Sequence, residues 1–315
     1  MFAITRQTSS FAIILLLITI AATTLRLYFN PFDVELAESE FMPRWWEVLV
    51  SCIMLFIAGV VVNRATVKAG IFGGFSSLPV SVYGFLGCGV LLSPNMVVAS
   101  TLALLMAVVT MFLLYSMQNM RDKESLFTAA LFMGIMPLVY PPTVAFVLIL
   151  FVAIFVGPLS LRQIIIALAG YLIPFAGMSY LHWYLGNPIS EIALNMWAAI
   201  IHPATKITLE PMPVLTLVIV AELVLVLLHG FAVGVNNRFT MLVPVRKSVQ
   251  LSSWFLVVAL ATLLLVPGCS VTVIPAVAIP ATVIFSFSLD RMESKLANIF
   301  YLTMVLLMLV HLFIY

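Results

Sequence analysis

Long apolar runs separated by short polar connections follow one another along the whole chain. Most runs approach the roughly 20 apolar residues that a helix needs to cross the hydrocarbon core of a bilayer. Several of them end at Pro or Gly, as at 93–95 and 267–268. The pattern predicts about eleven membrane-spanning helices, at about 11–28, 46–63, 77–93, 96–116, 125–139, 142–157, 163–184, 212–230, 249–266, 270–288 and 296–315.

Composition supports this interpretation. Of 315 residues, 64% are hydrophobic and 8% are charged, whereas a soluble domain carries about 25% charged residues. So few charges cannot cover a soluble globule, and so apolar a chain cannot be disordered. We expect a single domain over 1–315, an all-α polytopic transmembrane bundle. The chain has no basic stripe, which argues against nucleic-acid binding.

The distribution of Lys and Arg predicts an orientation. Cytoplasmic connections of membrane proteins are enriched in these residues. With the N-terminus inside, three basic residues lie outside: Arg26, Arg44 and Lys206. The remaining eleven lie inside: Arg6, Arg64, Lys68, Arg121, Lys123, Arg162, Arg238, Arg246, Lys247, Arg291 and Lys295. This bias predicts an inside N-terminus, an outside C-terminus and two long outer loops, at about 29–45 and 185–211.

The runs at 125–139 and 142–157 leave one alternative open. They meet at Tyr140-Pro141-Pro142 and are short. They are either two short spans or a re-entrant pair.

The first outer loop is acidic. It holds Asp33, Glu35, Glu38 and Glu40 and ends at Arg44. One carboxylate could act as a general base or bind a metal, and Arg44 could pair with an anionic lipid head group. The alternative is a solvated acidic loop, because the positive-inside rule does not penalise carboxylates outside. The spacing does not match a calcium loop.

Within the predicted eighth span, Glu222 is the one acidic residue deep in an apolar run. Ionisable groups at such depth usually face a cavity or a partner. His229 follows two helical turns later on the same face. Glu222 and His229 could together form a proton relay or line a polar cavity. The alternative is that Glu222 is a protonated group that is hydrogen-bonded to a neighbouring helix.

The second outer loop contains apolar residues at near-helical spacing over 189–201. This spacing predicts an amphipathic helix at the membrane interface, with Trp197 at the level of the head groups.

No metal site is predicted. The three cysteines lie far apart and show no zinc-type spacing. The four histidines, His182, His202, His229 and His311, do not cluster either. No cofactor can be assigned from the sequence.

The middle of the chain carries a resemblance. A charged loop, RDKES, at 121–125 leads to two short runs that meet at 139–142, and an inside turn at 157–162 leads to a long run ending near Trp183. This order resembles the central block of type C glycosyltransferases, polytopic enzymes that use polyprenyl-linked sugar donors on the outer face.

The same stretch, together with Val-Asn-Arg at 62–64 and Ser-Leu-Pro at 77–79, resembles an uncharacterised bacterial inner-membrane family. That resemblance covers roughly 11–187. Some members carry a carotene-monooxygenase label, but dispersed histidines do not make the converging ligand set of a non-haem iron site.

The type C resemblance implies an acidic catalytic residue in the first outer loop. By position this role would fall to Asp33 and Glu35, with Arg26 or Arg44 holding the lipid phosphate. We therefore expect a bacterial inner-membrane protein of envelope assembly that binds or uses a polyprenyl-linked glycan. Two alternatives stay open: a transporter or flippase using Glu222 and His229, or a non-catalytic subunit packed against other envelope membrane proteins. Whether the protein is an enzyme also stays open.

Overall fold

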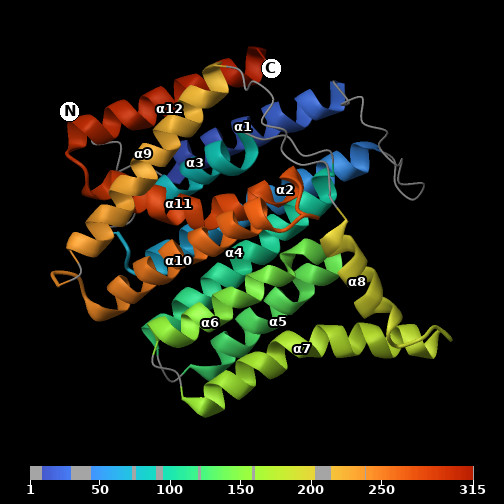
Figure 1. Ribbon diagram of the computed structural model, residues 1–315. Helices are drawn as coiled ribbons and strands as arrows, with labels where there is room; N and C mark the ends of the chain where they lie inside the picture. The colour runs from blue at the N-terminus through green and yellow to red at the C-terminus, as the bar shows by residue number, and fades with distance from the viewer. Residues whose placement is uncertain are drawn as a thin grey trace.

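The computed structural model describes residues 9–29, 44–72, 76–89, 95–119, 122–157, 160–202, 214–237 and 239–314. These ranges are helical throughout, with short connections and without any β-strand (Figure 1). The all-α prediction is therefore confirmed for this part of the chain.

The elements follow one another as α1 (Ser9–Phe29), α2 (Arg44–Lys68), α3 (Leu78–Tyr83) continuing into the π-helix η2 (Gly84–Gly89), α4 (Met96–Gln118), α5 (Lys123–Val139), the 3₁₀-helix η3 (Pro141–Phe146), α6 (Val147–Val156), α7 (Leu161–Tyr184), α8 (Glu191–Ile201), α9 (Val214–Asn236), α10 (Val243–Leu265), the 3₁₀-helix η4 (Val271–Val273), α11 (Ile274–Arg291) and α12 (Ser294–Ile314).

Seven helices of the described residues are long and apolar enough to cross a membrane: α2, α4, α7, α9, α10, α11 together with η4, and α12. They identify a multi-pass membrane protein that contacts the bilayer. Shorter apolar helices lie at Phe11–Thr23, Leu78–Gly87, Pro141–Val156 and Glu191–Ile201. The count of eleven spans and the orientation of the termini stay predictions.

Of the predicted third span, 77–93, the structure describes the residues up to Gly89. The described helix comprises α3 and η2, from Leu78 to Gly89. Twelve residues at the rise of an α-helix extend only about 18 Å, well short of a bilayer core of about 30 Å. This segment lies inside the bundle, against α1, α2 and α11, where its backbone is shielded by protein.

Helix α11 forms the centre of the bundle (Figure 1). Its apolar window is 94% buried, and it packs against α4, α9, α10 and the α3–η2 segment. Small side chains permit such close packing in membranes. Gly230 of α9 is one example, because a Cβ there would lie 2.9 Å from the carbonyl oxygen of Ile284.

The connections gather at two opposite ends of the bundle. At the first end, which we call the α8 end, α8 packs on η3, and the Gly268 N–H donates to the Ile200 carbonyl at 3.0 Å. At the other end, the Lys68 ammonium lies 3.8 Å from the centre of the Tyr115 ring, and Gly70 lies beside Val245 at the start of α10. We call this the basic end.

The short helices α5 and α6 extend between these two ends. Helix α5 begins at the basic end, where Asp122 caps it in the electrostatic field of Lys68. Tyr140 then reaches the α8 end, where its hydroxyl group donates to the Gly268 carbonyl at 2.9 Å. After α6 the chain has returned to the basic end, since Gly157 packs on Met117 of α4. The chain thus runs from the basic end to the α8 end and back over α5 and α6, and the choice between two short spans and a re-entrant pair stays open.

Candidate functional site

The acidic-loop residues Asp33 and Glu35 lie outside the described residues. Arg26 belongs to α1 and Arg44 begins α2, but their side chains are outside the described part as well. Their roles as catalytic and phosphate-binding residues therefore stay predictions.

Glu222 is buried on α9, and its Oε1 accepts a hydrogen bond from the hydroxyl group of Thr303 on α12. The Thr303 hydroxyl also lies 2.9 Å from the carbonyl oxygen of Ile299, one turn earlier on α12. Glu222 therefore joins α9 to α12. A polar bond between two helices is a common way to stabilise their packing within a membrane.

His229, two turns further along α9, binds a different helix. Its Nδ1 lies 2.9 Å from the hydroxyl oxygen of Ser288 on α11. Glu222 and His229 share a face, but they are about 10 Å apart along the helix axis by the rise of an α-helix, and each has its own partner. In the described residues they do not form a continuous hydrogen-bonded chain.

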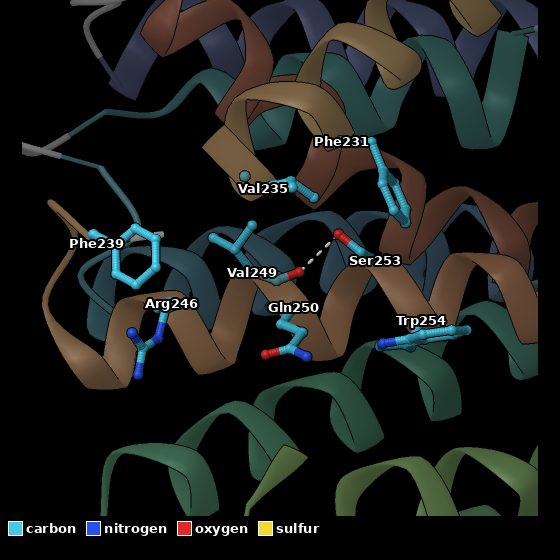
Figure 2. Close-up of a pocket in the computed structure, with 9 residues that line it drawn as sticks. Phe231, Val235, Phe239, Arg246, Val249, Gln250, Ser253 and Trp254 are labelled. Carbon is cyan, nitrogen blue, oxygen red and sulfur yellow. Dashed lines mark hydrogen bonds between the residues drawn. The ribbon is translucent and has the colours of Figure 1, made fainter. Parts of the chain in front are cut away.

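A cavity that the sequence did not indicate lies between α9 and α10 at the basic end (Figure 2). Its volume is about 620 Å³, within the range typical of small-molecule sites. The lining residues are Phe231, Gly234, Val235, Phe239, Arg246, Val249, Gln250, Ser253 and Trp254. We call this cavity the α9–α10 groove.

The two edges of the groove differ in character. Along α10, Arg246, Gln250 and Trp254 recur every four residues and form one row (Figure 2), because residues four apart lie on the same side of a helix. Phe231 and Val235 of α9 form the opposite, apolar edge. The groove is thus mainly apolar and aromatic, with an arginine at the end nearest the α9–α10 turn.

Local packing fixes the shape of the groove. Gly234 lies in the last turn of α9, where a Cβ would come within 3.3 Å of the Val249 side chain. The glycine therefore lets α9 approach α10 closely at the floor. The Ser253 hydroxyl donates to the carbonyl of Val249 at 2.9 Å, so its hydrogen-bond donor is used within α10.

The electrostatics of the groove favour an anion. The lining residues that the structure describes include Arg246 and no carboxylate. A guanidinium group keeps its charge at any working pH, and its planar set of donors matches carboxylate and phosphate oxygens. The groove can therefore accept a molecule with an anionic head and an apolar tail.

Glu222 and His229 lie away from this groove. Phe231 is two residues beyond His229, which places it about 200° around the helix. The predicted polar face of α9 thus contacts α11 and α12, and the groove lies on the other side. The single hint in the sequence was the Arg246–Gln250–Trp254 spacing, which becomes informative only once α9 is known to pack beside it.

The described residues contain no group of three or more His, Cys, Asp or Glu side chains that could hold a metal ion. His182 instead pairs with Glu191, with Nδ1 and Oε2 3.6 Å apart. Burial raises the pKa of the Cys269 thiol to about 11, so this thiol stays protonated near neutral pH, and a protonated thiol is a poor nucleophile.

Comparison with protein-family models, with curated proteins and with solved structures found no match to this chain.

Proposed function

We propose that the protein binds a phosphate-bearing lipid in the α9–α10 groove. The observation that carries this proposal is that Arg246 lines one end of an apolar, aromatic-walled cavity. The phosphate binds Arg246 through charge-assisted hydrogen bonds. The lipid chain lies between Phe231 and Val235 on one side and Trp254 on the other.

The position of the groove supports a lipid rather than a soluble anion. Both of its walls belong to helices that are long and apolar enough to span the membrane. Trp254 is 47% exposed and Phe239 is 79% exposed, so the groove opens onto the apolar surface of the bundle. A lipid enters from the bilayer without leaving it.

The resemblance to type C glycosyltransferases narrows the lipid class in our proposal. The ligand is a polyprenyl phosphate or a polyprenyl-linked glycan, used in envelope assembly at the bacterial inner membrane. If the protein is catalytic, Asp33 or Glu35 deprotonates the acceptor hydroxyl as the sugar leaves its phosphate carrier, and Arg26 or Arg44 holds that phosphate.

A second candidate function is lipid translocation. The groove lies at the basic end, which the positive-inside rule assigns to the cytoplasmic side. The acidic loop is predicted on the opposite side. A lipid phosphate bound at Arg246 is therefore in the inner leaflet, away from Asp33 and Glu35, and this separation favours a transporter over an enzyme that reacts at the groove.

Lipid binding can be tested on the purified protein by native mass spectrometry. The probes are a polyprenyl phosphate and the uncharged polyprenol of equal chain length. We expect the phosphate to bind more tightly, and Arg246→Gln to weaken its binding by about tenfold or more, because a hydrogen bond to a charged group contributes about 1.5–3 kcal/mol.

Lys247→Gln is the matched control. It removes the same charge from the neighbouring residue, which does not line the groove, and should leave the affinity for the phosphate within about twofold. Equal binding of phosphate and polyprenol by the wild type, or equal losses in both variants, would contradict the proposal.

The catalytic alternative has a separate test. Replacing Asp33 with Asn and Glu35 with Gln together removes both candidate bases. If the acidic loop is catalytic, glycan transfer is lost at normal protein level, while binding of polyprenyl phosphate persists. Unchanged glycan transfer in the double variant would exclude catalysis by the acidic loop, and lipid binding and lipid translocation would remain as candidate functions.

A further inference from the structure

Helix α8 exposes an apolar stripe on its outward side. Leu194, Trp197 and Ile201 are 63%, 64% and 52% exposed, and their spacing places them on one face. On the other side, Ile192, Met196 and Ile200 are half-buried where α8 meets the bundle. The helix is thus apolar on both sides, unlike a helix that lies between protein and water.

Both ends of α8 are fastened to the bundle. At its start, the Glu191 carboxylate lies 3.6 Å from Nδ1 of His182 at the end of α7. At its end, the carbonyl of Ile200 accepts from the Gly268 N–H, and a Cβ at Gly268 would lie 2.1 Å from the carbonyl oxygen of Ala199. These contacts hold the outward stripe of α8 in one orientation relative to the bundle.

The stripe follows α7 directly along the chain, and the end of α7 is exposed as well. This helix is a candidate span, and only 17% of its apolar window is buried inside the protein. Its last turns expose Tyr180, Trp183 and Tyr184 by more than half, as is typical of helices at a membrane–water boundary. A short turn with Gly186 at φ +89° then leads to α8.

We propose that α8 and the last two turns of α7 form one surface that docks into the lipid bilayer at the α8 end. The outward stripe lies among lipid chains, just below the head groups, and not in water. An exposed contiguous apolar patch marks an interaction site. The partner is the bilayer itself, because one short turn joins α8 to the exposed end of α7, a helix long and apolar enough to span a membrane. This proposal does not depend on the α9–α10 groove.

Spin labels on the full-length protein in phosphatidylcholine–phosphatidylglycerol vesicles test the proposal. Labels are attached at Leu194→Cys and Ile201→Cys, and their collision rates with oxygen and with a water-soluble nickel chelate are compared. Ser190→Cys, exposed in the turn before α8, is the aqueous control. Leu172→Cys, exposed in the middle of α7, is the lipid control. Unsubstituted protein treated with the same reagent supplies the background from the native cysteines.

We expect both α8 labels to favour oxygen over nickel as Leu172→Cys does, and Ser190→Cys to show the reverse. Two results would overturn the proposal. Nickel access equal to that at Ser190→Cys would place the stripe in water, and protection from both reagents would place it under protein. Gel filtration of each variant confirms folding, and the two α8 positions serve as independent measurements.

Discussion

The hydroxyl oxygen of Tyr140 accepts a hydrogen bond from the backbone N–H of Ser270 at 2.8 Å. The same hydroxyl group lies 2.9 Å from the carbonyl oxygen of Gly268. One phenol thus joins the turn before η3 to the α10–α11 connection. Burial raises the pKa of Tyr140, so the group stays protonated and can donate and accept together.

Removing this hydroxyl should destabilise the protein. In Tyr140→Phe, the half-buried N–H of Ser270 loses its acceptor, and leaving a fully buried group of this kind unsatisfied costs about 1–3 kcal/mol, an upper bound here. Thermal unfolding in detergent should show a lower Tm. Tyr180→Phe, at an exposed position on α7, is the control and should keep the Tm of the wild type. Equal Tm values for the wild type and Tyr140→Phe would contradict this role.

Two helical glycines should respond oppositely to alanine. At Gly134 on α5, a Cβ would lie 2.2 Å from the carbonyl oxygen of Tyr171, and the two helices would have to separate. Overpacking of this kind typically lowers the free energy of unfolding by about 1–3 kcal/mol. At Gly177 on α7 a Cβ meets nothing within 4 Å. Gly177→Ala should therefore be neutral or slightly stabilising, since alanine favours a helix. Similar Tm changes in both variants would show that the α5–α7 contact is not tight.

Asp122 should make stability depend on pH in the acid range. Its Oδ1 accepts from the Ser125 N–H at 3.1 Å, and its Oδ2 accepts from the Ser125 hydroxyl at 2.5 Å. The side-chain hydrogen bond from Ser125 is the main cause that lowers the pKa of Asp122 below its ordinary value. Because the pKa is lower in the folded state, the carboxylate contributes stability above its unfolded pKa and loses it as pH falls through the folded value.

The measurement is Tm against pH for the wild type and Asp122→Asn. Asparagine can cap a helix but does not titrate over this range. We expect the wild type to be the more stable at neutral pH and the difference to shrink below about pH 4, near the ordinary pKa of Asp. A difference that stays constant down to pH 3 would exclude this contribution.

Glu222→Gln separates a structural role from a proton relay. Glutamine keeps the shape and the oxygen that accepts from Thr303, so membrane insertion and Tm should stay near those of the wild type. We expect function to persist as well, because Glu222 and His229 bind separate helices. Loss of function at normal Tm, shared by His229→Asn, would instead establish the relay.

Thiol labelling in intact cells tests the orientation. Ser190, in the turn before α8, and Glu124, at the basic end, are both exposed. An impermeant reagent should label Ser190→Cys and reach Glu124→Cys only after permeabilisation. Labelling of Glu124→Cys in intact cells would reverse the predicted orientation.

Apolar runs located most helices from the sequence, because a bilayer requires long continuous apolar segments. The packing of Leu78–Gly89 inside the bundle could not be predicted, since the same composition suits a helix that faces lipid and a helix buried by its neighbours. The α9–α10 groove could not be predicted from the sequence, for a different reason. Phe231 and Trp254 are ordinary apolar residues of separate spans, and only the packing of α9 beside α10 gives them a common cavity.

The partners of Glu222 and His229 were equally hidden. Thr303 and Ser288 lie 81 and 59 residues further along the chain, in runs that show no sign of pairing with α9. A hydroxyl in an apolar run bonds either its own helix or a neighbour, and sequence does not distinguish these choices.

The central place of α11 has a consequence for biosynthesis. This helix begins at Ile274, so the ribosome has already delivered α4, α9 and α10 to the membrane before it emerges. Until then the sides of α4 and α9 that will face it are in contact with lipid or with a temporary neighbour. Membrane insertion of the earlier helices and assembly of their core are therefore separate events, and the second begins only when α11 leaves the translocation machinery and displaces whatever occupied its place.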